Sequence, residues 1–174
     1  MKKLWLGILV LAIMTAGCGY TTSSALPGGM RTIYIEPFKN SVNFTTDLAR
    51  KLYIPLLEVK VRNAVVDRFQ FDGNLRIADP NKAAMTLKGA LVGYDRIALR
   101  FTNTNEVEEY RIQISVNLQL IDNENDQIIW EETGFVGEAT YFVSGPNARS
   151  ESAAIEEALV DLGRRIVERT IENW

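Results

Sequence analysis

The alternation of apolar and polar residues predicts that the second half of the chain is mostly β-strand. Residues 107–121 read VEEYRIQISVNLQLI, with an apolar side chain at every second position from Tyr110 onward. This pattern is typical of a strand with one buried and one solvated face. The apolar face is Tyr110, Ile112, Ile114, Val116, Leu118 and Leu120, and the polar face is Arg111, Gln113, Ser115, Asn117 and Gln119.

A second long strand is predicted over residues 85–101. Its odd positions are largely apolar, which predicts one buried face along the whole strand. These positions are Met85, Leu87, Leu91, Ile97, Leu99 and Phe101. Gly89 and Gly93 share that face, so we expect a helix or a bulge to press close there.

A third long strand and two short ones complete the predicted sheet. Residues 127–142 form the long strand, with a bulge expected at Gly134 or Gly137. Near the N-terminus, RTIYIEPF alternates as a strand that is ended by Pro37. LRIA at 75–78 is predicted to be a short edge strand.

Helical spacing of apolar residues appears in a first segment at 43–71. Thr45 or Thr46 is a suitable N-cap for this segment. Pro55 should divide it into a short helix and a longer one. The predicted inner stripe is Leu48, Leu52, Leu56, Val59, Val66 and Phe69.

The second helical segment closes the chain, starting at Ser150 or Ser152 and running to about Asn173. Its inner stripe is Ile155, Leu159, Leu162, Ile166, Val167 and Thr170. Its outer face is Glu156, Glu157, Asp161, Arg164, Arg165 and Glu168, which we interpret as a solvated helix surface.

The order of elements predicts an α+β fold, because the long strands are grouped between two helical segments. We expect a two-layer sandwich in which two main helices pack on one face of a largely antiparallel four-stranded sheet. The other face is polar but weakly charged. It is predicted to hold Ser115, Asn117, Gln119, Ala90, Val92 and Tyr94. Such a face suits contact with a partner or a polar lumen, and equally an ordinary solvated surface.

The first residues are typical of an export signal. Residues 1–17 combine two lysines, a short apolar run and a small Ala-Gly pair before Cys18, the only cysteine. The apolar run is too short for a membrane span. The pair before Cys18 is similar to a lipobox, although Thr15 stands where leucine is usual, and the alternative is an ordinary cleaved signal peptide. Gly19, where aspartate would signal inner-membrane retention, favours the outer membrane.

We therefore expect three parts in the chain. Residues 1–17 are a lipoprotein signal peptide, 18–29 are a lipidated flexible tether beginning at Cys18, and 30–174 are a single α+β domain. Several acyl chains on one residue hold a protein stably at a membrane, whereas one chain is marginal.

Composition excludes several function classes. The chain has no histidine, and Cys18 would be lipidated, so Ser–His and Cys–His catalysis and the usual zinc sites are excluded. Carboxylate catalysis stays formally possible, but the acidic residues lie at turns and on helix faces. Removing residues 1–17 leaves 17 basic and 22 acidic residues, a net charge of −5, which disfavours nucleic-acid binding. We predict a non-enzymatic protein without metal or cofactor.

Several segments in order resemble one known family. They are AGCGY after the leader, TIYIEPFKN, IADPNKAAMTLKGALVGYDR, EEYRIQISVNLQLID and the final ENW. The chain resembles the lipopolysaccharide (LPS)-assembly lipoprotein family, LptE, over nearly all of its mature length. The Glu109-Tyr110 pair that opens the alternating strand is the most telling feature. The resemblance implies two helices on a four-stranded sheet.

The resemblance also implies a function. Members of the family plug the lumen of the large outer-membrane LPS-export β-barrel (LptD), help that barrel assemble and bind LPS. Basic residues near the turn before the EY strand and in the loop entering the last helix are implied to contact LPS. Here these are Arg96, Arg100 and Arg111 for the first place and Arg149 for the second. The turn FTNTNE itself has no basic residue.

Three other hypotheses remain open at this stage. The chain could activate a cell-wall synthase or another envelope machine as a lipoprotein facing the periplasm. It could be an enzyme that uses a buried pair of carboxylates. It could also be a free periplasmic protein, which lipid labelling at Cys18 would test.

Overall fold

The computed structural model describes residues 30–42 and 54–172. The predicted leader, Cys18 and the tether lie outside the described residues, as do Thr45, Thr46, Leu48 and Leu52. The elements are β1 Thr32–Ile35, β2 Lys39–Asn40, α2 Leu57–Asp72, β3 Arg76–Ile77, β4 Met85–Phe101, β5 Val107–Asp122, β6 Gln127–Phe142 and α3 Glu151–Glu172. The predicted strands at the N-terminus, at 75–78 and at the three long segments are therefore confirmed.

The sheet is larger than predicted and mixed. It has six strands in the order β3-β1-β4-β5-β6, with β2 pairing further along β4. β4, β5 and β6 are antiparallel, whereas β1 pairs in parallel with both β3 and β4. The expectation of a four-stranded, largely antiparallel sheet was wrong because α2 acts as a crossover that returns the chain beside β1 in the same direction.

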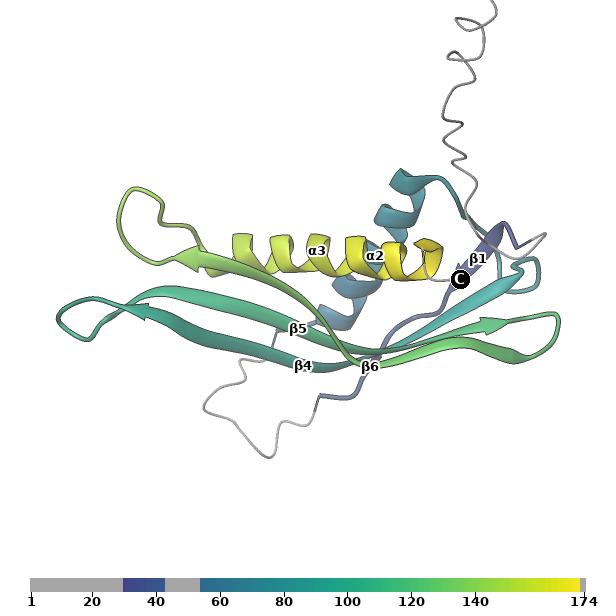
Figure 1. Cartoon of the computed structure of the whole chain (residues 1–174), viewed down its shortest axis with the longest axis horizontal. Helices are drawn as coiled ribbons and strands as arrows, with labels where there is room; N and C mark the ends of the chain where they lie inside the picture. The colour runs from purple at the N-terminus through teal and green to yellow at the C-terminus, as the bar shows by residue number, and fades with distance from the viewer. Residues whose placement is uncertain (1–29, 43–53, 173–174) are drawn as a thin grey trace, which may run out of the picture.

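Both described helices lie on one face of the sheet, as predicted, and within residues 30–42 and 54–172 the other face carries no helix (Figure 1). α3 packs on β5 and β6 and against α2. The core between the layers includes Ile33, Leu87, Leu120 and Phe69, each fully buried. The fold is thus a two-layer α+β sandwich.

The longer helix after Pro55 is confirmed, but its inner face is not the predicted one. Leu56 and Val59 are 63 % and 44 % exposed, while Phe69 is buried as expected. The buried positions are Leu57, Val61, Val65 and Phe69. The first turn begins only after Leu56, which has a left-handed backbone (φ 59°), so the stripe is counted from Leu57.

The distal part of β4 also turns different side chains toward the core than predicted. Its pairing with β5 shifts between Leu91 and Gly93, which leaves Val92 as an extra residue. A bulge of this kind reverses the faces of the side chains that follow it, here as far as the next shift in pairing, at Leu99. Tyr94, predicted on the helix-free face, is therefore buried beneath the helices. Ile97, Leu99 and Phe101, predicted to be buried, are 42 %, 40 % and 52 % exposed.

The glycines of the sheet lie where a neighbouring group approaches the backbone closely or where the strand bulges. A Cβ on Gly137 would stand 2.4 Å from Leu162 Cβ, so this glycine lets α3 approach β6. Gly134 has φ 65° at the irregular pairing opposite Asn117, which confirms the bulge predicted there. Of the helix or bulge expected at Gly89 and Gly93, the structure has a bulge beside Gly93, while the neighbour of Gly89 is Phe38.

α3 agrees closely with its prediction. The Ser150 hydroxyl accepts the N–H of Ala153 at 3.2 Å, which makes Ser150 the N-cap. All six residues of the predicted inner stripe are buried. The outer charges are not simply solvated, because Arg164 donates to both Asp161 and Glu168 along the helix.

Candidate functional site

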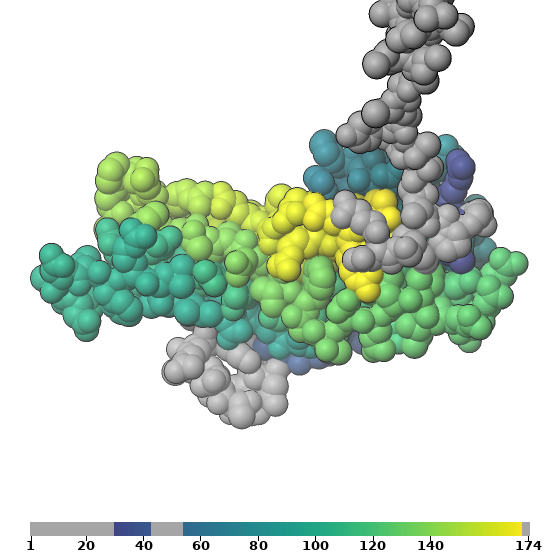
Figure 2. All heavy atoms as spheres, viewed as in Figure 1, coloured from purple at the N-terminus to yellow at the C-terminus, as the bar shows by residue number. Residues whose placement is uncertain are grey.

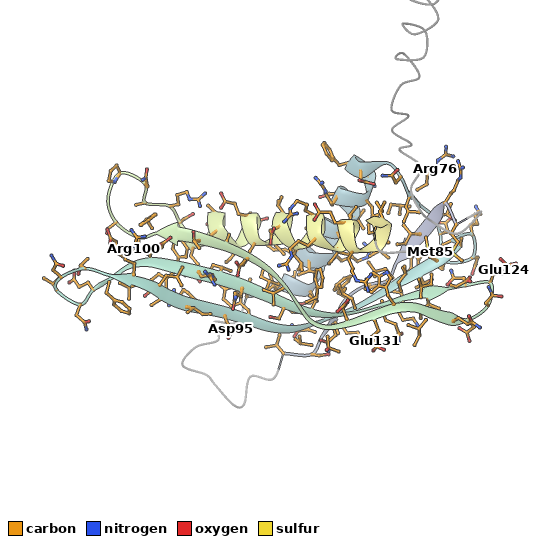
Figure 3. The ribbon with its side chains drawn as sticks, in the orientation of Figure 1. Arg76, Met85, Asp95, Arg100, Glu124 and Glu131 are labelled. Carbon is orange, nitrogen blue, oxygen red and sulfur yellow. The ribbon has the colours of Figure 1, made fainter. Side chains whose placement is uncertain are left out.

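The four arginines predicted to contact a ligand lie in one half of the molecule. We call this the distal half, meaning residues 93–101 of β4, 107–115 of β5 and 135–142 of β6 with the loop into α3. Figure 3 shows Arg100 at this end, where the β4–β5 hairpin projects, and Arg76 at the opposite end. The projecting hairpin also forms the narrow end of the space-filling view (Figure 2).

Arg96 belongs to a half-buried cluster under the start of α3. It donates to Glu151 at 2.6 Å, and the Tyr94 hydroxyl donates to the same carboxylate at 2.8 Å. Tyr141 reaches Glu151 at 3.4 Å and stacks on Tyr110, with ring centroids 5.8 Å apart. The Arg96 guanidinium lies 4.9 Å from the centre of the Tyr110 ring. This cluster joins the first residue of α3 to three strands.

Burial raises the pKa of Tyr94, and the hydrogen bond to the Glu151 carboxylate raises it further. Burial and the nearby Glu151 charge also raise the pKa of Tyr141. Both phenols are therefore neutral hydrogen-bond donors throughout the physiological range.

Arg100 and Arg111 lie on the helix-free face. Arg111 approaches Glu138 at 3.7 Å, and Arg100 approaches Glu109 at 3.5 Å. Ile97 is the direct β4 neighbour of Arg111 on this face. We use the name distal surface for Ile97, Arg100, Glu109, Arg111, Glu138 and Phe142. The Arg100 guanidinium lies 5.4 Å from the centre of the Phe142 ring.

Arg149 lies at the edge of β6 and is held there. It donates to both oxygens of Glu157, one at 2.9 Å, and to the carbonyl of Thr140 at 2.9 Å. Thr140 is the β6 neighbour of Arg111, which brings the two arginines to the same level of the sheet. The loop into α3 is thereby fixed against the strand.

The structure therefore places two predicted arginines on one surface, a third on the opposite face and a fourth at the edge. Each of the four is paired with a carboxylate. An arginine held by a surface carboxylate can exchange that partner for phosphate, which offers the same two-oxygen geometry. The distal surface adds Phe142 and Ile97, of which the sequence assigned Ile97 to the core, and Gly93 beside the bulge was the only sequence signal for its exposure.

Catalytic and metal-binding arrangements are not seen in residues 30–42 and 54–172. No group of three or more metal-ligating side chains occurs in these ranges. Asp122 is the one buried acidic side chain among them. Its pKa is lowered by hydrogen bonds from Asn125 and the Glu124 N–H, as in a tight turn. None of the helices in these ranges is long and apolar enough to span a bilayer.

A family model described as LptE, lipopolysaccharide-assembly, matches residues 30–170. The chain belongs to the LptE family. This membership confirms the resemblance carried by the sequence and gives the chain a general role as an LPS-assembly lipoprotein of the cell envelope. Among curated proteins, no sequence matches the chain.

Solved structures share the fold at low identity. A hypothetical protein from Chlamydia trachomatis has TM-score 0.53 and 14 % identity, covering 80 % of this chain and 94 % of that one. A minor lipoprotein from Acinetobacter baumannii has TM-score 0.51 and 14 % identity, covering 84 % and 95 %. A Xanthomonas campestris protein has TM-score 0.50 and 15 % identity, covering 86 % and 89 %. These likenesses extend over most of each chain and support the two-layer fold.

Proposed function

We propose that this LptE-family chain is lipidated at Cys18, held at the outer membrane, and partners the LPS-export β-barrel. In this role it plugs the lumen of the barrel, assists its assembly and binds LPS on the way to the cell surface. No bond is made or broken in this function, which is why the chain needs no cofactor.

The composition of the distal surface carries the proposal. Arg111 lies beside Ile97, and Arg100 lies beside Phe142, so cations and apolar side chains alternate on one exposed face. LPS combines phosphate groups with acyl chains, and it requires both kinds of contact at once. Arginine is the better cation for this purpose because its planar fork matches two phosphate oxygens.

The rest of the helix-free face supports a position inside a barrel. Ser115, Asn117 and Gln119 continue the face along β5, where Lys88 of β4 and Glu131 of β6 lie on either side of Gln119. Large outer-membrane barrels enclose polar, water-filled interiors, and a polar surface of this kind suits them.

LPS phosphate would have to compete with the glutamates that already pair with the distal arginines. Glu138 and Glu109 already occupy Arg111 and Arg100, so phosphate must replace them. The Arg111–Glu138 pair is exposed, and surface ion pairs of this kind contribute only about 0–1 kcal/mol, so its replacement is inexpensive, whereas the Glu109 side chain is only 13 % exposed. Arg149 is less available, because its bond to the Thr140 carbonyl also secures the strand edge.

Recovery of partners from the native envelope tests the proposal. Affinity purification of the lipidated chain should recover a large β-barrel protein, and depletion of the chain should reduce surface LPS. Labelled palmitate should be incorporated by the wild-type chain and not by Cys18→Ala. Recovery of a peptidoglycan synthase without a barrel, together with unchanged surface LPS, would contradict the proposal.

A further inference from the structure

The two outer edges of the distal half differ in how their backbone groups are satisfied. On β6, side chains from α3 and its entry loop bond to alternate residues of the edge. The three contacts are Arg149 to the Thr140 carbonyl, Asp161 to the Glu138 N–H, and Arg165 to the Val136 carbonyl. Covering an edge in this way protects it from pairing with another chain.

Among the residues that the structure describes, β4 has no such cover in the distal half. Its outer neighbour β2 pairs with Ala90 and Leu91, and the Ser41 N–H donates to the Leu91 carbonyl at 2.8 Å. Beyond this point β4 continues to Phe101 and pairs only with β5 among the described residues.

The alternation of the ladder shows which β4 groups point outward. The Glu138 N–H points away from β5, so the backbone N–H and C=O of its β5 partner Gln113 point toward β4. Asp95 pairs with Gln113, and its backbone groups therefore point inward, toward β5. The backbone groups of Tyr94, Arg96 and Ala98 point outward, and nothing in the described part of the chain bonds to them.

We propose that the stretch from Gly93 to Ala98 accepts an added β-strand from a partner protein, and that the partner is the LPS-export barrel. The proposal rests on the proposed function for the identity of that partner. Irregular pairing at Val92 and Leu99 limits the stretch at both ends. Main-chain hydrogen bonds would supply affinity, and the exposed side chain of Ile97 would favour an apolar residue beside it.

A second copy of this chain fits the edge poorly. Outward-pointing residues must face one another in an antiparallel pair, so only two registers pair as many as five of these six residues. One places Arg96 opposite Arg96, and the other places Asp95 opposite Asp95. Like charges directly opposite each other destabilise a sheet. The occupant is therefore an extended segment with a different sequence.

Residue-resolved amide exchange tests the proposal on the full chain, alone and in complex with the co-expressed barrel. In the isolated chain the Tyr94, Arg96 and Ala98 amides should exchange fast, while Asp95 and Ile97 stay protected. In the complex all five should be protected. Ala98→Pro should weaken the complex roughly tenfold, since it removes one outward N–H. Asn103→Pro, in the hairpin turn, should leave the complex unchanged.

The contrary outcomes separate this proposal from the proposed function. A stable complex in which the three amides still exchange fast would overturn strand addition alone. The absence of any complex would overturn both. Protection of the same amides in the isolated chain would show that the chain, or a second copy if it depends on concentration, covers the edge. Should Ala98→Pro fold poorly, Ile97→Ser provides a second variant, and unchanged affinity would count against the proposal.

Discussion

The two halves of the sheet share one apolar core, which includes Ile112 and Ile114 of the distal half, but the distal half adds a polar cluster to it. In the proximal half, where β1 and β3 extend the sheet beside Met85 to Leu91, the layers meet through apolar side chains such as Ile33, Leu87 and Phe69. In the distal half, the start of α3 is joined to the sheet by Glu151, with Tyr94 and Arg96 bonded to its carboxylate.

Apolar contacts mainly stabilise the fold, whereas the polar groups of the distal half are available to bind a ligand or a partner. Apolar burial is non-directional and insensitive to ligands, so the shared core supplies most of the free energy of folding. Ion pairs and hydrogen bonds can exchange partners, so the added polar groups of the distal half can respond to phosphate and to a partner strand.

The largest effect is expected in the proximal core. Phe69→Ala should lower the free energy of unfolding by about 3–5 kcal/mol, because it leaves a cavity between α2 and the sheet. Phe71→Ala is the matched control. That ring is 82 % exposed and contacts the Arg68 guanidinium, so the loss should be at most about 1 kcal/mol. Urea unfolding of the lipid-free chain measures both, and equal losses would contradict the comparison.

A smaller effect is expected from the distal cluster. Glu151→Gln should cost about 1–3 kcal/mol, because Arg96 and Tyr94 then share a weaker, uncharged acceptor. Glu156, also on α3, forms an exposed ion pair with Lys60 of α2, and Glu156→Gln should cost about 0–1 kcal/mol. The same urea titration measures the loss of stability in both variants. A Glu151→Gln loss no larger than that of Glu156→Gln would show that the cluster does not secure α3.

The distal cluster should also make stability depend on pH above about 10. The folded chain has a raised pKa at Tyr94, so its proton is retained while an unfolded tyrosine loses one. The stabilisation is complete below the unfolded pKa and declines as pH rises above it. Tyr94→Phe should flatten this decline in unfolding measurements between pH 8 and 11. An unchanged slope would exclude Tyr94 as its source.

The smallest effect is expected at the distal surface. Glu138→Gln frees Arg111 from its carboxylate and should strengthen LPS binding roughly threefold, with little change in stability. Glu131→Gln, on β6 in the proximal half, is the control and should leave binding unchanged. Titration of LPS into the purified chain measures both. Weaker binding by Glu138→Gln would mean that the carboxylate itself takes part in the site.

The sequence predicted most of the elements for a simple reason. Long strands such as 107–121 keep a strict period of two, and α3 keeps its period from Ile155 to Thr170. The parallel pairings of β1 were not predictable, because four-residue strands carry too little pattern to reveal a partner. The stripe of α2 was misassigned because the pattern does not show where the helix begins after Pro55.

The candidate site was predicted only in part. The arginines were found, because charge is visible in the sequence. Their partners were not, since Glu138 and Glu151 are distant in sequence from the arginines they hold. The exposed apolar side chains at Ile97 and Phe101 were assigned to the core. One extra residue at Val92 reverses the faces of the residues after it, and although Gly93 indicated a helix or a bulge, the alternation alone does not decide between the two.

The most direct test of the account is the affinity of the purified lipid-free chain for LPS, compared between the two ends of the sheet. The double variant Arg100→Gln with Arg111→Gln should bind at least about tenfold more weakly than wild type, because both phosphate contacts are lost. Arg31→Gln with Arg76→Gln, exposed residues at the proximal end, should bind as wild type does. Equal affinity for all three proteins would contradict the assignment of LPS binding to the distal surface.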